Sequence, residues 1–193
     1  IHNPNGAPDL KYKGVTPTGP LPKSVDFPLY RVDDKEEFKI MVFGDPQVYN
    51  LTQVEYLKKG VVHELKGAQG YEFGISLGDL VGNNPDLFKP YIDVMKEIGL
   101  PWYHVMGNHD INFDVPNDTL SDVSFKAHFG PNNYSFNKGK VHFIVLDDVI
   151  YNGEGASRQY IGGLREDQLE FIENDLKFVP KDHLVVICAH IPL

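Results

Sequence analysis

Apolar and polar positions alternate along the chain in a pattern that predicts short strands separated by helices. Residues 38–43 and 71–77 are apolar runs of strand length. Between them, residues 51–66 carry apolar side chains at the spacing of one helical face. A strand, a helix and a second strand in this order predict a βαβ unit with parallel strands.

The same alternation continues to the end of the chain. A helix over residues 85–98 would start with Pro85 in its first turn and end before Gly99. Further predicted elements are a strand at 102–106, a short helix at 120–128, strands at 134–136 and 141–146 around a Lys138-Gly139 turn, a helix at 166–178 and a strand at 184–189. This order indicates an α/β fold.

The first part of the chain differs in composition. Residues 1–37 hold six of the 14 prolines and few apolar clusters. Such a segment is typical of extended chain. We therefore predict a proline-rich lead-in or linker at 1–37 and a single folded domain at 38–193.

Composition and charge narrow the possible partners. A chain of 193 residues with 41% hydrophobic residues is typical of a globular domain. The formal charge of −9, with no run of basic residues, argues against nucleic acid or an anionic membrane as a partner. No apolar run reaches membrane-spanning length. The lone cysteine, Cys188, is predicted to be a buried thiol, and the oligomeric state stays open.

Polar residues that bind metals follow several of the predicted strands directly. They are Asp45 and Gln47 in Gly-Asp-Pro-Gln, Asp79 in Gly-Asp-Leu-Val, Asn108 and His109 in Gly-Asn-His-Asp, and His190 after the last strand. One Asp after a strand is usually a turn former or helix cap. Several such ends in order favour convergence at one sheet edge, where α/β folds build their sites. Oxygen and imidazole donors meeting there predict a two-metal site.

These motifs, in this order, resemble those of the calcineurin-like metallophosphoesterases. The family motifs run Asp-x-His, Gly-Asp, Gly-Asn-His-Asp or Glu, a lone His, and Gly-His-x-His, and the resemblance covers most of the chain after Phe38. It implies a β-sandwich of mixed sheets flanked by helices. It also implies hydrolysis of phosphomonoesters or phosphodiesters by a hydroxide activated by two divalent ions, which are Mn, Mg, Fe or Zn.

The resemblance also implies a role for each matching residue. Asp45 would bind the first ion, Asp79 would bridge both, and Asn108 with His190 would bind the second. His109 would act as the catalytic acid or stabilise the transition state. The substrate implied is a small phosphoester, whose identity the sequence leaves open.

Gln47 departs from the family pattern, because it stands in place of the histidine of the first motif. As a ligand, its amide oxygen would favour hard ions such as Mg²⁺ or Mn²⁺. The alternative is that Gln47 only hydrogen-bonds Asp45 or a metal-bound water. Part of the family has Asp-Pro-Gln in this motif, so Gln47 is compatible with activity.

The final Gly-His-x-His motif does not follow His190. Two ligands of the family pattern are therefore absent, and we expect a fold that is incomplete at its C-terminal end. The alternative is a non-catalytic phosphate-binding or interaction scaffold that keeps the phosphoesterase fold. The proline-rich start and the Asp-Pro-Gln motif favour a periplasmic or secreted protein, with a cytoplasmic one as the alternative.

The residues after the second motif separate this chain from two branches of the family. Gly82, Asn83 and Asn84 stand where protein serine/threonine phosphatases have an Asp and an Arg. Gly82 also occupies the place of the iron-binding Tyr of purple acid phosphatases. Neither a protein phosphatase nor a ferric charge-transfer site is therefore expected.

Several other polar residues are predicted to have structural roles. His104 and His142 lie in strands and are expected to be hydrogen-bonded. Asp147 and Asp148 are expected to cap a turn or helix, with support of the site as the alternative. Arg158 is expected in a solvated loop, with contact to a substrate phosphate as the alternative.

Overall fold

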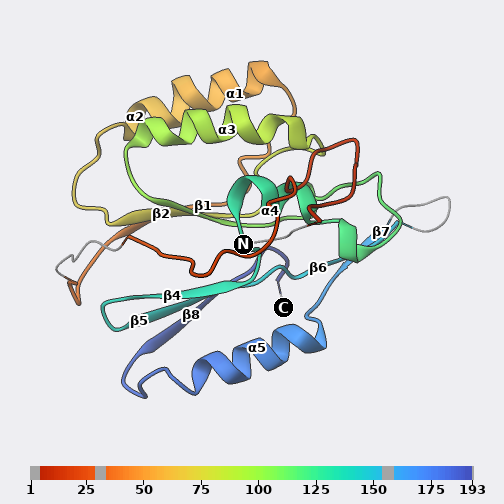
Figure 1. The fold of residues 1–193 in the computed structure, drawn as a ribbon. Helices are drawn as coiled ribbons and strands as arrows, with labels where there is room; N and C mark the ends of the chain where they lie inside the picture. The colour runs from red at the N-terminus through yellow and green to blue at the C-terminus, as the bar shows by residue number, and fades with distance from the viewer. Residues whose placement is uncertain (1–4, 29–33, 154–158, 193) are drawn as a thin grey trace.

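Two β-sheets face each other at the centre of the molecule, and helices cover their outer faces (Figure 1). This computed structural model describes residues 5–28, 34–153 and 159–192. The first sheet has the order β1-β2-β3 and all its neighbours are parallel. Its strands are β1 (Ile40–Phe43), β2 (Phe73–Leu77) and β3 (Trp102–Val105). The predicted βαβ unit is confirmed.

Two helical runs cover the outer face of the first sheet (Figure 1). The first consists of α1 (Leu51–Leu57), a π-helical turn (Lys58–Val62) and α2 (His63–Leu65). The second consists of a 3-10 turn (Pro85–Leu87), α3 (Phe88–Met95) and a second 3-10 turn (Lys96–Ile98). Both predicted helices are therefore present, although neither is regular throughout. None of the helices in the described ranges has the length and apolar character needed to cross a membrane.

The second sheet is mixed, as expected for this fold. It has the order β4-β5-β8, with β4 and β5 antiparallel and β5 and β8 parallel. Its strands are β4 (Tyr134–Lys138), β5 (Val141–Val145) and β8 (Leu184–Cys188). Helix α5 (Glu166–Leu176) lies along its outer face (Figure 1). A 3-10 turn (Asp118–Leu120) and α4 (Val123–Phe129) connect the two sheets.

A short antiparallel hairpin is the element that the sequence did not predict. Strands β6 (Val149–Asn152) and β7 (Gln159–Gly162) pair in the region where a solvated loop was expected. Every residue of β7 is exposed, so no alternation of apolar and polar positions marks it as a strand. Arg158, which was considered for this loop, lies outside the described residues.

Two apolar cores hold the layers together. One lies between the sheets, where Phe73 and Ile75 of the first sheet belong to the same buried cluster as Phe143, Val145 and Cys188 of the second. Cys188 is buried as predicted, and burial raises the pKa of its thiol to about 11. The other core packs the helices on the first sheet; its largest fully buried side chains include Tyr91, Phe88, Phe125, Ile98 and Met106.

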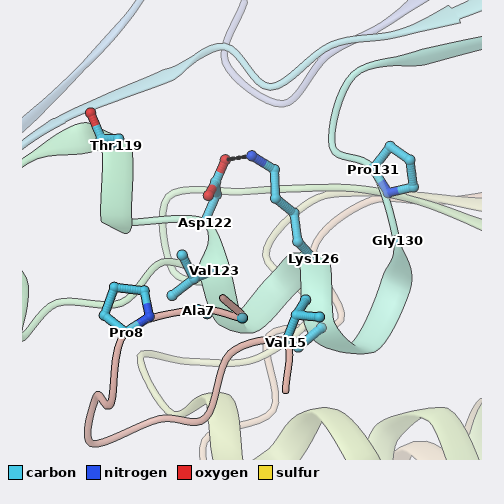
Figure 2. A pocket seen from close by; sticks show the side chains of 11 residues that line it. Ala7, Pro8, Val15, Thr119, Asp122, Val123, Lys126, Gly130 and Pro131 are labelled. Carbon is cyan, nitrogen blue, oxygen red and sulfur yellow. Dashed lines mark ion pairs between the residues drawn. The ribbon is translucent and has the colours of Figure 1, made fainter. Parts of the chain in front are cut away.

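The segment at residues 5–28 contains no helix or strand. It folds back on itself where Ala7 N donates to Val15 O at 2.7 Å, and it lies against α4. Between the segment and α4 is a cavity of about 620 Å³, bordered by the ion pair of Asp122 and Lys126 (Figure 2). None of the predicted site residues is among the described residues that line this cavity.

Candidate active site

Backbone hydrogen bonds join the loops that follow β1, β2 and β3. Gln47 N donates to Asp79 O at 2.7 Å, and Gly82 N donates to Val48 O at 2.9 Å. Asn83 N donates to His109 O at 3.1 Å. The three predicted motifs therefore lie side by side at the carboxyl edge of the first sheet, as the parallel strands require.

Asp110, the last residue of Gly-Asn-His-Asp, joins the loop after β2 to the loop after β3. Its Oδ1 accepts from Val81 N at 3.0 Å, and its Oδ2 accepts from Leu80 N at 3.1 Å and Gly107 N at 2.9 Å. The residue is fully buried, and burial raises the pKa of its carboxyl to about 7 against the opposing effect of these N–H groups. Asp110 therefore has a structural role in the site.

Backbone strain is concentrated in the same loops. Among the described residues, the only non-glycine residues with positive φ are Gln47 at 39°, Asp79 at 48° and Asn83 at 62°. The left-handed conformation costs about 1–2 kcal/mol per residue. Strain of this kind persists where the surroundings fix the backbone, and it is frequent at functional sites.

Two glycines allow the site residues to approach closely. A Cβ atom at Gly78 would lie 2.4 Å from His190 Nδ1. A Cβ atom at Gly107 would lie 2.1 Å from Asp79 N. Both motifs therefore need glycine before the Asp or Asn, because a larger residue would displace His190 or Asp79.

Asp79 is the buried carboxylate at the centre of the site. It is 4% exposed; its Oδ1 accepts from His109 N at 2.9 Å and its Oδ2 accepts from Gln47 Nε2 at 3.2 Å. Gln47 therefore makes a hydrogen bond within the site. The alternative to a ligand role was a hydrogen bond to Asp45 or to a metal-bound water, but the partner in the structure is Asp79. The Asp45 side chain is 55% exposed, and its Oδ1 lies 3.9 Å from His190 Nδ1.

His190 reaches this site from β8 of the other sheet. Its Nδ1 donates to Leu77 O at 2.8 Å, which directs Nε2 towards two oxygens. These are Asn108 Oδ1 at 3.0 Å and Asp79 Oδ1 at 3.3 Å. Burial alone would lower the pKa of His190, but the hydrogen bonds to Asp79 and Leu77 and the charges of Asp79 and Asp45 raise it to about 9.

Asp148 fixes the loop that carries His190. Its Oδ1 accepts from His190 N at 3.2 Å, and its Oδ2 accepts from Ile191 N at 2.9 Å. Asp148 lies between β5, which ends at Val145, and β6, which begins at Val149, so the chain leaving the second sheet contributes this support. The sequence offered support of the site as the less favoured role for Asp148, and the contacts favour it.

The donors around His190 Nε2 suit one divalent cation. Adjacent ligands on an octahedral ion, each at about 2.1 Å, lie about 3.0 Å apart. The distances of 3.0 and 3.3 Å from Nε2 to Asn108 Oδ1 and Asp79 Oδ1 are close to this spacing. The hydrogen bond from Nδ1 to Leu77 O is also the arrangement that metal-binding histidines commonly have.

The side chains predicted to bind the other ion are those of Asp45, Asp79 and Gln47. In the described part of the chain, no three His, Cys, Asp or Glu side chains form a group that could hold a metal ion. An amide oxygen, from Asn108 or Gln47, is therefore needed in any set of three donors among the described residues. Asp45 Oδ1 lies 3.9 Å from His190 Nδ1, and Gln47 Nε2 donates to Asp79 Oδ2. The metal-binding roles of all five residues stay predictions.

His109 lies beside Asp79 and is held by Asn83. Its Nδ1 is 2.7 Å from Asn83 Oδ1, and its Nε2 is 3.9 Å from Asp79 Oδ2. The imidazole is 26% exposed, so solvent or a substrate can reach it. The contact with Asn83 was not predicted, because the position of Asn83 after the second motif does not indicate its partner.

Comparisons with known proteins identify the family and the fold. The sequence profile of the calcineurin-like phosphoesterases matches residues 38–193. The chain belongs to this family. No protein of curated function matches the sequence.

Two solved structures share the fold. A dimetal phosphatase from Danio rerio is 17% identical, with a TM-score of 0.55 over 80% of this chain and 70% of that one. A purple acid phosphatase from yellow lupin seeds is 16% identical, with a TM-score of 0.52 over 77% of this chain. This chain spans only 29% of the lupin enzyme. At these identities the likeness shows the fold alone.

Proposed function

We propose that the protein hydrolyses a phosphomonoester or phosphodiester at the loops after β1, β2, β3 and β8. The observation that carries this proposal is the convergence of Asp79 Oδ1 and Asn108 Oδ1 on His190 Nε2, at 3.3 and 3.0 Å, with His109 alongside. Three loops from two sheets supply these groups, and separate structural purposes would not require them to meet.

Two divalent ions, when bound, would lower the pKa of a water and neutralise charge on the phosphoryl group. Asp79, Asn108 and His190 would hold one ion, and Asp45, Asp79 and Gln47 the other. Gln47 now donates to Asp79, so its amide would have to turn to offer its oxygen. Leu77 O and Asp148 keep His190 in place throughout.

His109 would supply the proton that the leaving oxygen needs. The side-chain oxygen Oδ1 of Asn83 accepts from Nδ1–H, so Nε2 is the nitrogen that faces the centre of the site. A proton on Nε2 can be donated to the leaving oxygen as its bond to phosphorus breaks. The same N–H can also stabilise negative charge on that oxygen.

Hydrolysis of p-nitrophenyl phosphate and bis(p-nitrophenyl) phosphate with Mn²⁺ or Mg²⁺ tests the proposal. We expect His109→Ala to lower turnover by about 10²-fold or more, the usual contribution of a general acid. Bound metal, measured by elemental analysis, should stay near the wild-type amount. His63→Ala, at an exposed position in α2, is the matched control.

Two results would overturn the proposal. Unchanged turnover in His109→Ala would remove the assigned role of this histidine. A wild-type protein that retains no metal and hydrolyses neither ester would instead be a scaffold that keeps the phosphoesterase fold.

A further inference from the structure

An exposed aromatic ring stands next to His109. The Tyr49 ring centroid lies 6.3 Å from that of the imidazole, and the two planes meet at 68°. Tyr49 is 48% exposed, although it follows Val48, which is 3% exposed. The ring therefore forms part of the surface of the candidate site.

A lone exposed tyrosine is ordinary in a folded protein, but the position of this one is fixed. A Cβ atom at Gly82 would lie 2.3 Å from the Tyr49 ring, so the ring fills the space above the Gly82 backbone. Gly82 N donates to Val48 O at 2.9 Å, and Tyr49 N donates to Gln53 Oε1 at 2.7 Å. The ring is thus held between two of the loops that form the site.

We propose that Tyr49 binds the leaving group of the substrate and that this group contains an aromatic ring. The inference rests on the proposed function, because it requires His109 to protonate the leaving oxygen. That oxygen must come within about 3 Å of His109 Nε2. The substituent on the oxygen then lies in the space next to Tyr49.

The aromatic character of Tyr49 determines which class of leaving group it binds best. Aromatic rings pair favourably at centroid separations of about 4.5–7 Å, beyond the gain from burying apolar area. A saturated ring or alkyl group gains only the burial. A nucleobase or an aryl ring therefore gains more from Tyr49 than an alkyl group of equal size.

Binding of non-hydrolysable phosphonates to the Mn²⁺-loaded protein tests this inference without depending on turnover. Phenylphosphonate, cyclohexylphosphonate and methylphosphonate would be compared by calorimetry. We expect the wild type and Tyr49→Phe to bind the phenyl compound about tenfold more tightly than the methyl compound, as an aromatic contact of about 1.4 kcal/mol gives. Cyclohexylphosphonate should bind more weakly than phenylphosphonate.

Tyr49→Ala should lose this preference while its affinity for methylphosphonate stays unchanged. Tyr56→Ala, which removes another exposed tyrosine from α1, should keep it. Thermal unfolding of each variant shows whether it is folded, and Tyr49→Phe provides a test that keeps the packing on Gly82.

The outcomes separate the two proposals. Equal affinity of the wild type for all three phosphonates, or a preference that persists in Tyr49→Ala, overturns the role of Tyr49 and leaves the proposed function intact. Equal binding of the cyclohexyl and phenyl compounds shows selection by size, which also overturns it. Failure of the metal-loaded wild type to bind any phosphonate overturns the proposed function, and the role of Tyr49 with it.

Discussion

Asn83 and His109 are joined at two points. The Asn83 backbone N–H donates to His109 O at 3.1 Å, and Asn83 Oδ1 accepts from His109 Nδ1 at 2.7 Å. Asn83 has a φ of 62°, a conformation that Asn tolerates better than most residues. The strained backbone thus places an amide oxygen where it orients the imidazole.

Removing that amide should reduce turnover. In Asn83→Gly the backbone keeps its conformation without strain, but His109 loses its partner. We expect kcat to fall about 10- to 100-fold, as for other groups that orient a functional histidine, with metal content unchanged. Asn83→Asp keeps an acceptor oxygen and should retain more activity than Asn83→Gly. Equal kcat in Asn83→Gly and wild type would show that His109 needs no such support.

Asp148 should control metal affinity through His190. Asp148→Ala removes both acceptors of the His190 and Ile191 N–H groups, and Asp148→Asn removes one. We expect Mn²⁺ affinity to fall about 10- to 100-fold in Asp148→Ala and less in Asp148→Asn, measured by titration calorimetry. Asp167→Asn, in the exposed first turn of α5, is the control. Wild-type affinity in both Asp148 variants would contradict this role.

His104 should make the fold less stable in acid. Burial lowers the pKa of His104 to about 3, and its Nε2 has no hydrogen-bond partner among the described residues. The unfolded chain binds a proton below about pH 6.5 that the folded chain does not, so stability is lost as the pH falls from 6.5 towards 3. At pH 5 this loss amounts to about 2 kcal/mol.

His104→Phe should remove this loss. The centroid of the His104 ring lies 4.5 Å from that of the Phe129 ring. A cavity of about 210 Å³ beside His104 leaves room for the larger phenylalanine side chain. Urea unfolding at pH 8 and pH 5 measures the change, with His63→Gln, an exposed histidine, as the control. If the unfolding free energy of His104→Phe fell as much between pH 8 and pH 5 as that of the wild type, the assignment to His104 would be contradicted.

Asp175 should be important for the attachment of α5 to the second sheet. Its Oδ2 lies 2.7 Å from Nε2 of buried His142, and its Oδ1 accepts from Ser135 Oγ at 2.9 Å. Asp175→Ala leaves both partners unsatisfied, which costs about 2–3 kcal/mol of unfolding free energy. Glu170→Ala, at an exposed position of the same helix, should cost less than about 0.5 kcal/mol. Equal stability of the two variants would show that this network contributes little.

The strands and the loops after them were predictable, because their signals are local. Residues 38–43, 71–77 and 102–106 read as strands from short apolar runs, and the glycine before each Asp or Asn marks a sharp turn. The structure has β1, β2 and β3 within these ranges. The parallel order then brings Asp79 and Asn108 together without further information.

Features that depend on distant partners were not predictable. The π-helical turn at Lys58–Val62 interrupts a run whose apolar spacing is that of a regular helix. The hydrogen bond from Gln47 to Asp79 and the contact of Asn83 with His109 join residues 32 and 26 positions apart. Such pairings depend on loop conformations with positive φ, which the sequence does not specify.

The origin of His190 in the second sheet has a consequence for how the protein unfolds. Asp79 and Asn108 belong to the layer of β1, β2 and β3, whereas His190 arrives on β8. A cation coordinated by all three would act as a crosslink between the halves of the sandwich. Its binding energy would then oppose their separation, so chelation would loosen the contact between the layers as well as abolish catalysis.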